Sequence, residues 1–159
     1  MRASFGKSAL MRRIAAGLRA AGLEPGARVM IRMGNTSDYA LLFFGAIAAG
    51  CVPLPSSAQL TEKEADFLLT DSGARIIAVS DELSIEPPLG VRVFSAAETA
   101  ALRAKHLPMD YADTAADEPA FLVYTQALPA NPRACCTLSA QRGDADRCIK
   151  IGMASAQMM

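Results

Sequence analysis

Histidine and cysteine are scarce in this sequence. The only histidine is His106, and three of the four cysteines, Cys135, Cys136 and Cys148, lie in the last quarter. Tetrahedral zinc needs four well-spaced ligands, and these cysteines follow no zinc spacing, so we expect no metal site. His106 has polar neighbours and is expected to be a solvated loop residue. Cys51 is expected to be a small buried thiol.

An excess of one charge and a long apolar run are also lacking. Sixteen acidic residues balance sixteen lysines and arginines, whereas a nucleic-acid surface needs a basic excess. The apolar stretch 39–54 is shorter than the ~20 residues that a membrane helix needs, and prolines close it. Charged residues interrupt the N-terminus before a secretory signal can form. We therefore expect a soluble cytoplasmic protein with neither a nucleic-acid nor a membrane partner.

The chain is organised around residues 29–54, which have the pattern of a strand, a helix and a second strand. Large apolar side chains at every second position of 29–33 predict a strand with one well-buried face. The polar residues 35–38 can cap a helix, the almost wholly apolar segment 39–49 can form it, and Gly50 can end it in a left-handed conformation. A helix this apolar should pack against a sheet inside a larger body.

Helices and strands continue to alternate as far as Thr125. Capping boxes, in which Thr61 pairs with Glu64 and Ser95 with Glu98, mark the starts of two helices. We predict helices over 10–21, from Thr61 to about Gly73 and from Ser95 to about Lys105, and strands over 76–79, 91–94 and 119–125, with a connector over 107–118. This alternation favours parallel pairing. The predicted fold is α/β, a mostly parallel sheet flanked by helices.

Several blocks of the sequence match the N-terminal part of a known family. They are Leu18 to Gly26 followed by Arg28-Val29, then Asn35, Phe43 to Gly50 with Val52 to Pro55, Gln59 to Thr61 with Glu64, and Asp71 to Arg75. With these blocks and their spacing, residues 4–125 resemble the AMP-forming acyl- and aryl-CoA synthetases of the adenylate-forming superfamily (AMP-dependent synthetases and ligases). The details lean toward the benzoate-CoA ligase branch.

The segment after Thr125 departs from the family pattern. In the family, the strand ending in Tyr-Thr leads into a loop rich in serine, threonine and glycine that closes with Lys-Pro-x-Gly. Its backbone N–H groups, hydroxyls and lysine bind the β- and γ-phosphates of ATP. Here residues 126–136 contain no glycine, lysine or serine. Thr125 is the one nucleotide-binding residue that survives, as a vestige, and the resemblance assigns no catalytic residue.

The genetic code offers a reason for this departure. Codons for residues 126–141, read one base earlier, can spell Ser-Gly-Thr-Ser-Gly-Lys-Pro-Thr-Gly and the family segment that follows it. Our hypothesis is a one-base deletion after the Thr125 codon; a divergent natural tail is the alternative. We therefore divide the chain into a partial AMP-binding N-terminal domain, 1–125, and an out-of-frame tail, 126–159. The tail has neither helical nor strand periodicity, and we expect it to be disordered.

The resemblance implies a parent enzyme that joins a carboxylate to CoA in two steps, using Mg-ATP to form an acyl-adenylate and pyrophosphate before CoA displaces AMP. In the family, the acid pocket, the other nucleotide contacts and the catalytic lysine follow the phosphate loop. We expect this chain to be an inactive remnant that binds no ATP, Mg or CoA. Two alternatives stay open. One is a binding module that docks on an intact ligase or a complementary fragment through the strand edge near Thr125, where aggregation is also a hazard. The other is a stand-alone regulatory domain.

Overall fold

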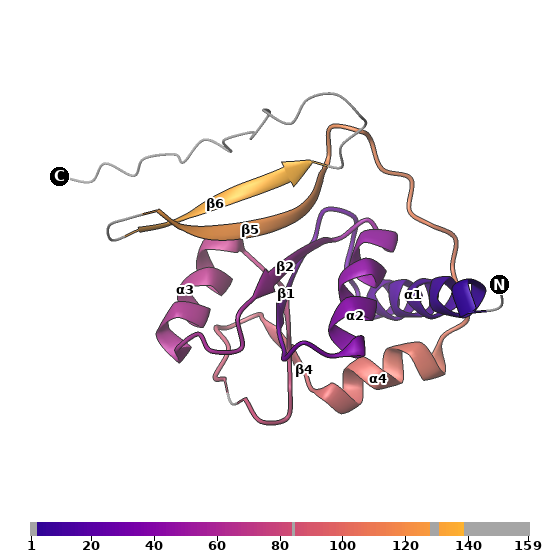
Figure 1. Ribbon diagram of the computed structural model, residues 1–159, viewed down its shortest axis with the longest axis horizontal. Coiled ribbons are helices and arrows are strands. Elements are labelled where there is room, and N and C mark those ends of the chain that lie inside the picture. Colours follow the sequence, from indigo (N-terminus) through magenta and orange to yellow (C-terminus); the bar gives the residue numbers. More distant parts are fainter. Residues whose placement is uncertain (1–2, 84, 128–130, 139–159) are drawn as a thin grey trace.

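The computed structural model describes residues 3–83, 85–127 and 131–138. Its helices and strands are α1 (Ala3–Ala20), β1 (Arg28–Arg32), α2 (Ser37–Ala48), β2 (Val52–Ser56), α3 (Glu62–Ser72), β3 (Ile76–Val79), β4 (Arg92–Phe94), α4 (Ala96–Lys105), β5 (Pro119–Ala127) and β6 (Asn131–Leu138). The first four strands form one sheet in the order β2-β1-β3-β4, with every neighbouring pair parallel (Figure 1). This arrangement confirms the predicted α/β class.

The β1–α2–β2 unit forms as the sequence predicts. Thr36 is the N-cap of α2, and its hydroxyl accepts a hydrogen bond from the Tyr39 N–H. Gly50 follows the helix with a φ of +74°, a left-handed conformation that costs glycine no steric penalty. The chain then returns through β2, which pairs with β1 along its whole length. Local capping and turn chemistry therefore set both ends of this helix.

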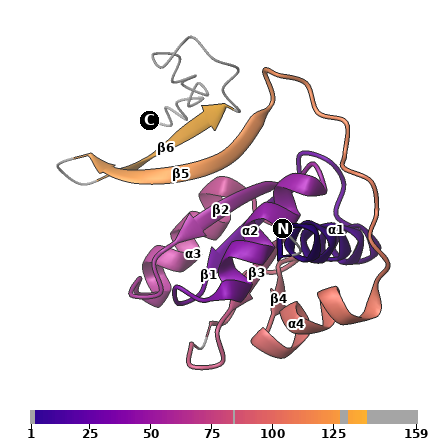
Figure 2. The same ribbon diagram turned by 45° about the vertical axis from the view of Figure 1, so that its right-hand side comes forward.

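The central sheet is buried on both faces, so the prediction of one buried face for β1 is wrong. Val29 and Ile31 pack into a core with α1, α2 and α4, whereas Met30 packs into a second core with α3 and Leu122 of β5. Figure 2 shows these elements on opposite sides of the sheet. A parallel strand covered on both faces is apolar at successive positions. The apolar Met30 between Val29 and Ile31 is the sequence feature that indicates burial of the second face.

Both predicted capping boxes are present. The Glu64 N–H donates to the Thr61 hydroxyl at 3.3 Å, and the Thr61 N–H donates to the Glu64 carboxylate at 2.8 Å. The same reciprocal pair joins Ser95 and Glu98 at the start of α4. Gly73 ends α3 with a φ of +65°. These contacts join residues three positions apart, which is why the sequence alone predicts them.

The strand predicted over 119–125 exists, but it does not join the parallel sheet. Instead β5 pairs antiparallel with β6 as a separate two-stranded sheet that lies against β2. Among residues 119–124 only Leu122 is buried. The structure thus differs at 131–138 from the expectation of a disordered tail, because the backbone of β6 pairs with β5. The rest of that tail, 128–130 and 139–159, lies outside the described residues.

Two further findings concern the described part of the chain only. None of its helices combines the length and the apolar character needed to cross a membrane. It also contains no group of three or more His, Cys, Asp or Glu side chains arranged to hold a metal ion.

Candidate functional site

Thr125, the residue that the resemblance marks as nucleotide-binding, lies near the end of β5, opposite Arg133 of β6. The pairing continues through Gln126 and Ala127, so that only 128–130, Leu-Pro-Ala, separate the two strands. A phosphate cradle needs several backbone N–H groups free to face the ligand. In the family, the backbone after this threonine forms the phosphate loop. Here its described part, Gln126 and Ala127, pairs with β6.

A parallel sheet usually binds ligands where the strand order reverses, at the carboxyl ends of the strands. In this sheet that point lies between β1 and β3. The charged residue at this end of β1 is Arg32, which is only 4% exposed. Its guanidinium donates to the carbonyl of Leu60, in the loop before α3. Arg32 therefore holds the β2–α3 connection in place.

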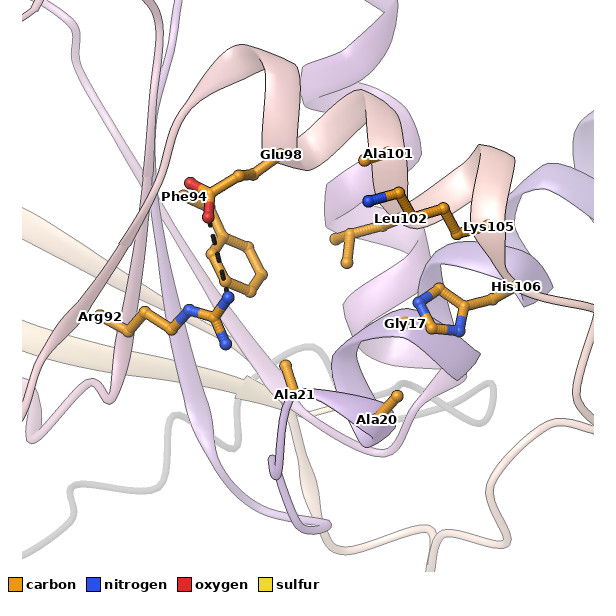
Figure 3. A pocket seen from close by; sticks show the side chains of 10 residues that line it. All are labelled: Gly17, Ala20, Ala21, Arg92, Phe94, Glu98, Ala101, Leu102, Lys105 and His106. Carbon is orange, nitrogen blue, oxygen red and sulfur yellow. Dashed lines mark ion pairs between the residues drawn. The ribbon is translucent and has the colours of Figure 1, made fainter.

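A cavity of about 260 Å³ lies between α1, β4 and α4 (Figure 3). Its lining residues are Gly17 and Ala20 of α1, Ala21 in the turn after it, Arg92 and Phe94 of β4, and Glu98, Ala101, Leu102, Lys105 and His106 of α4 and its C-terminal cap. The buried residues Gly17, Phe94 and Leu102 form its floor, and the charged side chains lie at its exposed rim.

The space exists because the residues that line it from the α1 side are all small. A Cβ on Gly17 would lie 2.8 Å from Cδ2 of Leu102 and 3.0 Å from the His106 ring, so the two helices touch closely at this point. Ala20 and Ala21 then leave room that a larger side chain would fill. The cavity is therefore a consequence of helix packing between segments far apart in the sequence.

The rim of the cavity carries both signs of charge. The Arg92 guanidinium lies 3.7 Å from the Glu98 carboxylate and 4.8 Å from the centre of the Phe94 ring. Lys105 is exposed. His106 is the C-terminal cap of α4 and lies in the bend after the helix, as expected of a loop residue, but it is partly buried and so less solvated than expected. It lost part of its solvent contact because Gly17 of α1 packs against it.

Sequence reasoning did not find this cavity. The α4 side of it, from Glu98 to Lys105, follows ordinary helical spacing, and nothing in that spacing identifies the helix opposite. The α1 side offers only a glycine and two alanines, which are typical of close helix packing. Only the tertiary contact between α1 and α4 brings the two sides together.

Comparison with known proteins identifies the family. The family described as AMP-binding enzyme matches residues 8–126. The long-chain-fatty-acid–CoA ligase FadD13 of Mycobacterium tuberculosis is 31% identical over 144 residues, covering 79% of this chain and 27% of the ligase. A benzoate–CoA ligase of Thauera aromatica is 42% identical over 62 residues, covering 39% of this chain and 12% of the ligase.

Solved structures agree with the sequence match. The inhibitor-bound N-terminal domain of FACL13 from Mycobacterium tuberculosis superimposes with a TM-score of 0.72 at 26% identity, covering 81% of this chain and 35% of that one. The chain spans only about a quarter, 27%, of the length of the FadD13 ligase. The expected similarity to the benzoate-CoA ligase branch is compatible with these relatives, which include both fatty-acid and benzoate ligases. On this evidence the chain belongs to the AMP-binding enzyme family and covers its N-terminal part.

Proposed function

We propose that this chain is the N-terminal remnant of an ATP-dependent acid–CoA ligase and that the 159-residue polypeptide does not activate carboxylates by itself. The observation that carries the proposal is the segment after Thr125. Its residues 126–136 lack glycine, serine and lysine, and its described backbone pairs with β6. This segment therefore lacks the glycine, serine and lysine with which the family's loop would bind ATP phosphates.

The energetic argument points the same way. If Thr125 still met a nucleotide, one hydroxyl would contribute about 1 kcal/mol net. Stabilising a transferring phosphoryl group takes several pre-organised donors together with positive charge and a metal ion. For the parent enzyme we infer a carboxylic acid as the substrate, with CoA and Mg-ATP as the co-substrates, and the similarity to acid–CoA ligases supports this. Benzoate-like acids are favoured by the higher identity to the benzoate ligase, 42%, although over a shorter segment.

We attribute the remnant to a one-base deletion after the Thr125 codon, because codons compatible with residues 126–141 can spell the family loop when read one base earlier. Sequencing the gene tests this directly: an open reading frame one base earlier should encode the phosphate loop and continue into the rest of a ligase. A gene in which that frame encodes no family sequence would leave the divergent tail as the explanation.

Pyrophosphate release tests the lack of activity. The purified 159-residue chain, given Mg-ATP and a panel of aromatic and aliphatic acids, should release no more pyrophosphate than buffer does. The matched control is the product of the same gene with one base re-inserted after the Thr125 codon, which should be active with at least one acid. Turnover by the 159-residue chain would overturn the proposal.

A second candidate function, a binding module, is favoured by an aromatic cluster on α2 and β5. Phe43 contacts Phe44 and Phe121, with ring centres 5.3 Å and 5.7 Å away, yet Phe44 stays 50% exposed. An almost wholly apolar helix such as α2 needs cover on this face. The family match ends at residue 126, close in sequence to Phe121, so we assign the cover to the ligase part that this chain lacks.

We place the docking surface here and not at the strand edge near Thr125, because β6 already pairs one edge of β5. Co-expression with a family ligase lacking its matched N-terminal part should yield a complex that Phe44→Asp abolishes. Phe67→Asp, which alters an aromatic side chain that is 42% exposed on α3, is the control and should leave it intact. Equal loss in both variants, or no complex at all, would contradict the docking role.

A further inference from the structure

The cavity between α1, β4 and α4 has the composition of a ligand site. We propose that it binds a small monocarboxylate whose apolar body lies on Ala20 and Ala21 and whose carboxylate is bound by Lys105 and Arg92. The site lies at the β4 edge of the sheet, whereas β5, which carries Thr125, lies against the opposite edge strand, β2. It is independent of the proposed ligase function.

The charged and polar side chains at the rim of this site are largely unpaired within the described part of the chain. Among the described residues, neither Lys105 nor His106 has a hydrogen bond or ion pair with another side chain. Arg92 has only the Glu98 carboxylate, at 3.7 Å. Figure 3 shows the side chains of Arg92, Lys105 and His106 arranged around the same space. Positive and polar groups that converge on one space without satisfying one another suit an anionic ligand.

The charge of the rim selects the kind of anion. Arg92 and Lys105 are positive, Glu98 is negative, and with His106 counted as neutral the rim carries one net positive charge. One positive charge complements a monoanion. Near pH 7 inorganic phosphate is a mixture of mono- and dianion, and its dianion would face the Glu98 carboxylate with an uncompensated negative charge.

The apolar side chains that stay accessible in the cavity select the rest of the ligand. Phe94 and Leu102 are already buried beneath the charged rim, whereas Ala20 is exposed and Ala21 is half-buried. An apolar body that covers these two alanines removes their surface from water, which an inorganic anion cannot do. The volume of about 260 Å³ lies just below the roughly 300–1,000 Å³ of most ligand pockets. The ligand should therefore be no larger than a substituted ring.

Benzoate is a direct probe. In an amide NMR titration of the 159-residue chain, benzoate should shift the signals of Gly17, Ala21 and Leu102 in a saturable way. Benzamide, which has the same ring without the charge, and inorganic phosphate, which has charge without the ring, should shift them much less. Equal shifts with benzamide, equal shifts with phosphate, or no saturable shift with benzoate would each overturn the proposal.

Substitutions locate the binding groups. Lys105→Gln should raise the benzoate dissociation constant about fivefold, the loss expected for a partly exposed charged contact. Ala20→Leu should abolish binding by filling the space. Lys63→Gln, which removes an exposed charge from α3, is the control and should leave the dissociation constant unchanged. If Lys105→Gln and Lys63→Gln behave alike, Lys105 does not bind the carboxylate. Because these side chains are exposed, all three variants should keep the circular dichroism of the parent chain.

Discussion

Cys51 lies between α2 and β2, buried in the core that joins α1 to the sheet. Burial raises the pKa of its thiol to about 11, and the nearby positive charge of Arg19 opposes this shift only in part. The thiolate is the reactive form of cysteine. Cys51 is therefore a structural side chain in the folded protein, as the sequence indicates.

Raising the pH should destabilise the fold through this thiol. The unfolded chain loses the Cys51 proton near pH 8.5, whereas the folded chain keeps it up to about pH 11. The stability due to the neutral thiol is thus complete below about pH 8.5 and is lost as the pH rises through the pKa of the folded state. Urea unfolding across this range should show a loss that Cys51→Ala removes. An unchanged pH profile in Cys51→Ala would contradict this assignment.

The pKa of Glu64 is shifted in the opposite direction from that of Cys51. Hydrogen bonds from the Thr61 backbone and side chain lower the pKa of its carboxyl below the ordinary value. Its contribution is complete above the pKa of the unfolded chain, about 4.3, and is lost as the pH falls through the lower pKa of the folded state. Glu64→Gln should remove this acid dependence in unfolding experiments. Glu86→Gln, in an exposed loop, is the control and should retain it.

At the scale of elements, the contact between α1 and α2 depends on a glycine. A Cβ on Gly45 would lie 2.6 Å from Cγ2 and 2.8 Å from Cβ of Ile14, which is itself buried. Neither helix can move aside without opening the core. The pair therefore packs at a distance that only glycine allows.

Gly45→Ala should lower the free energy of unfolding by about 1–3 kcal/mol, the usual cost of overpacking. Gly6→Ala is the matched control, because a Cβ there meets nothing within 4 Å and the residue lies in α1. It should raise stability by about 0.5 kcal/mol. Thermal unfolding of the two variants measures the difference, and equal effects would show that α1 and α2 do not pack this closely.

At the scale of the whole molecule, Phe121, Leu122 and Tyr124 of β5 attach the β5–β6 pair to the body. Leu122 is 4% exposed in the core beneath β2 and α3, and the Tyr124 hydroxyl donates to the Asp71 carboxylate at 2.6 Å. The connector 107–118 that leads to β5 contains no helix or strand. Attachment of the pair therefore depends strongly on Leu122.

Leu122→Ala should cost about 2–4 kcal/mol of stability and expose β5 to hydrogen exchange. Val123→Ala is the control, because successive strand residues point to opposite faces and Val123 is only partly buried. Its cost should be less than half as large. Equal protection of β5 in both variants would mean that Leu122 does not hold the strand to the body.

The sequence by itself determined the helices, their caps, the parallel strands and the family, because these depend on contacts between near neighbours or on contiguous motifs. Thr61 and Glu64, three positions apart, are an example. It also determined that residues 126–136 lack the groups of a phosphate loop. The one-base deletion inferred from them stays a prediction.

Only the tertiary structure decided where β5 pairs, which face of α2 stays exposed, and that α1 and α4 enclose a cavity. The physical reason is the same in each case. These features depend on the shapes of surfaces brought together from distant parts of the chain, such as Gly17 against Leu102. A local pattern records that a residue is small or apolar, and it does not record which surface the residue will meet.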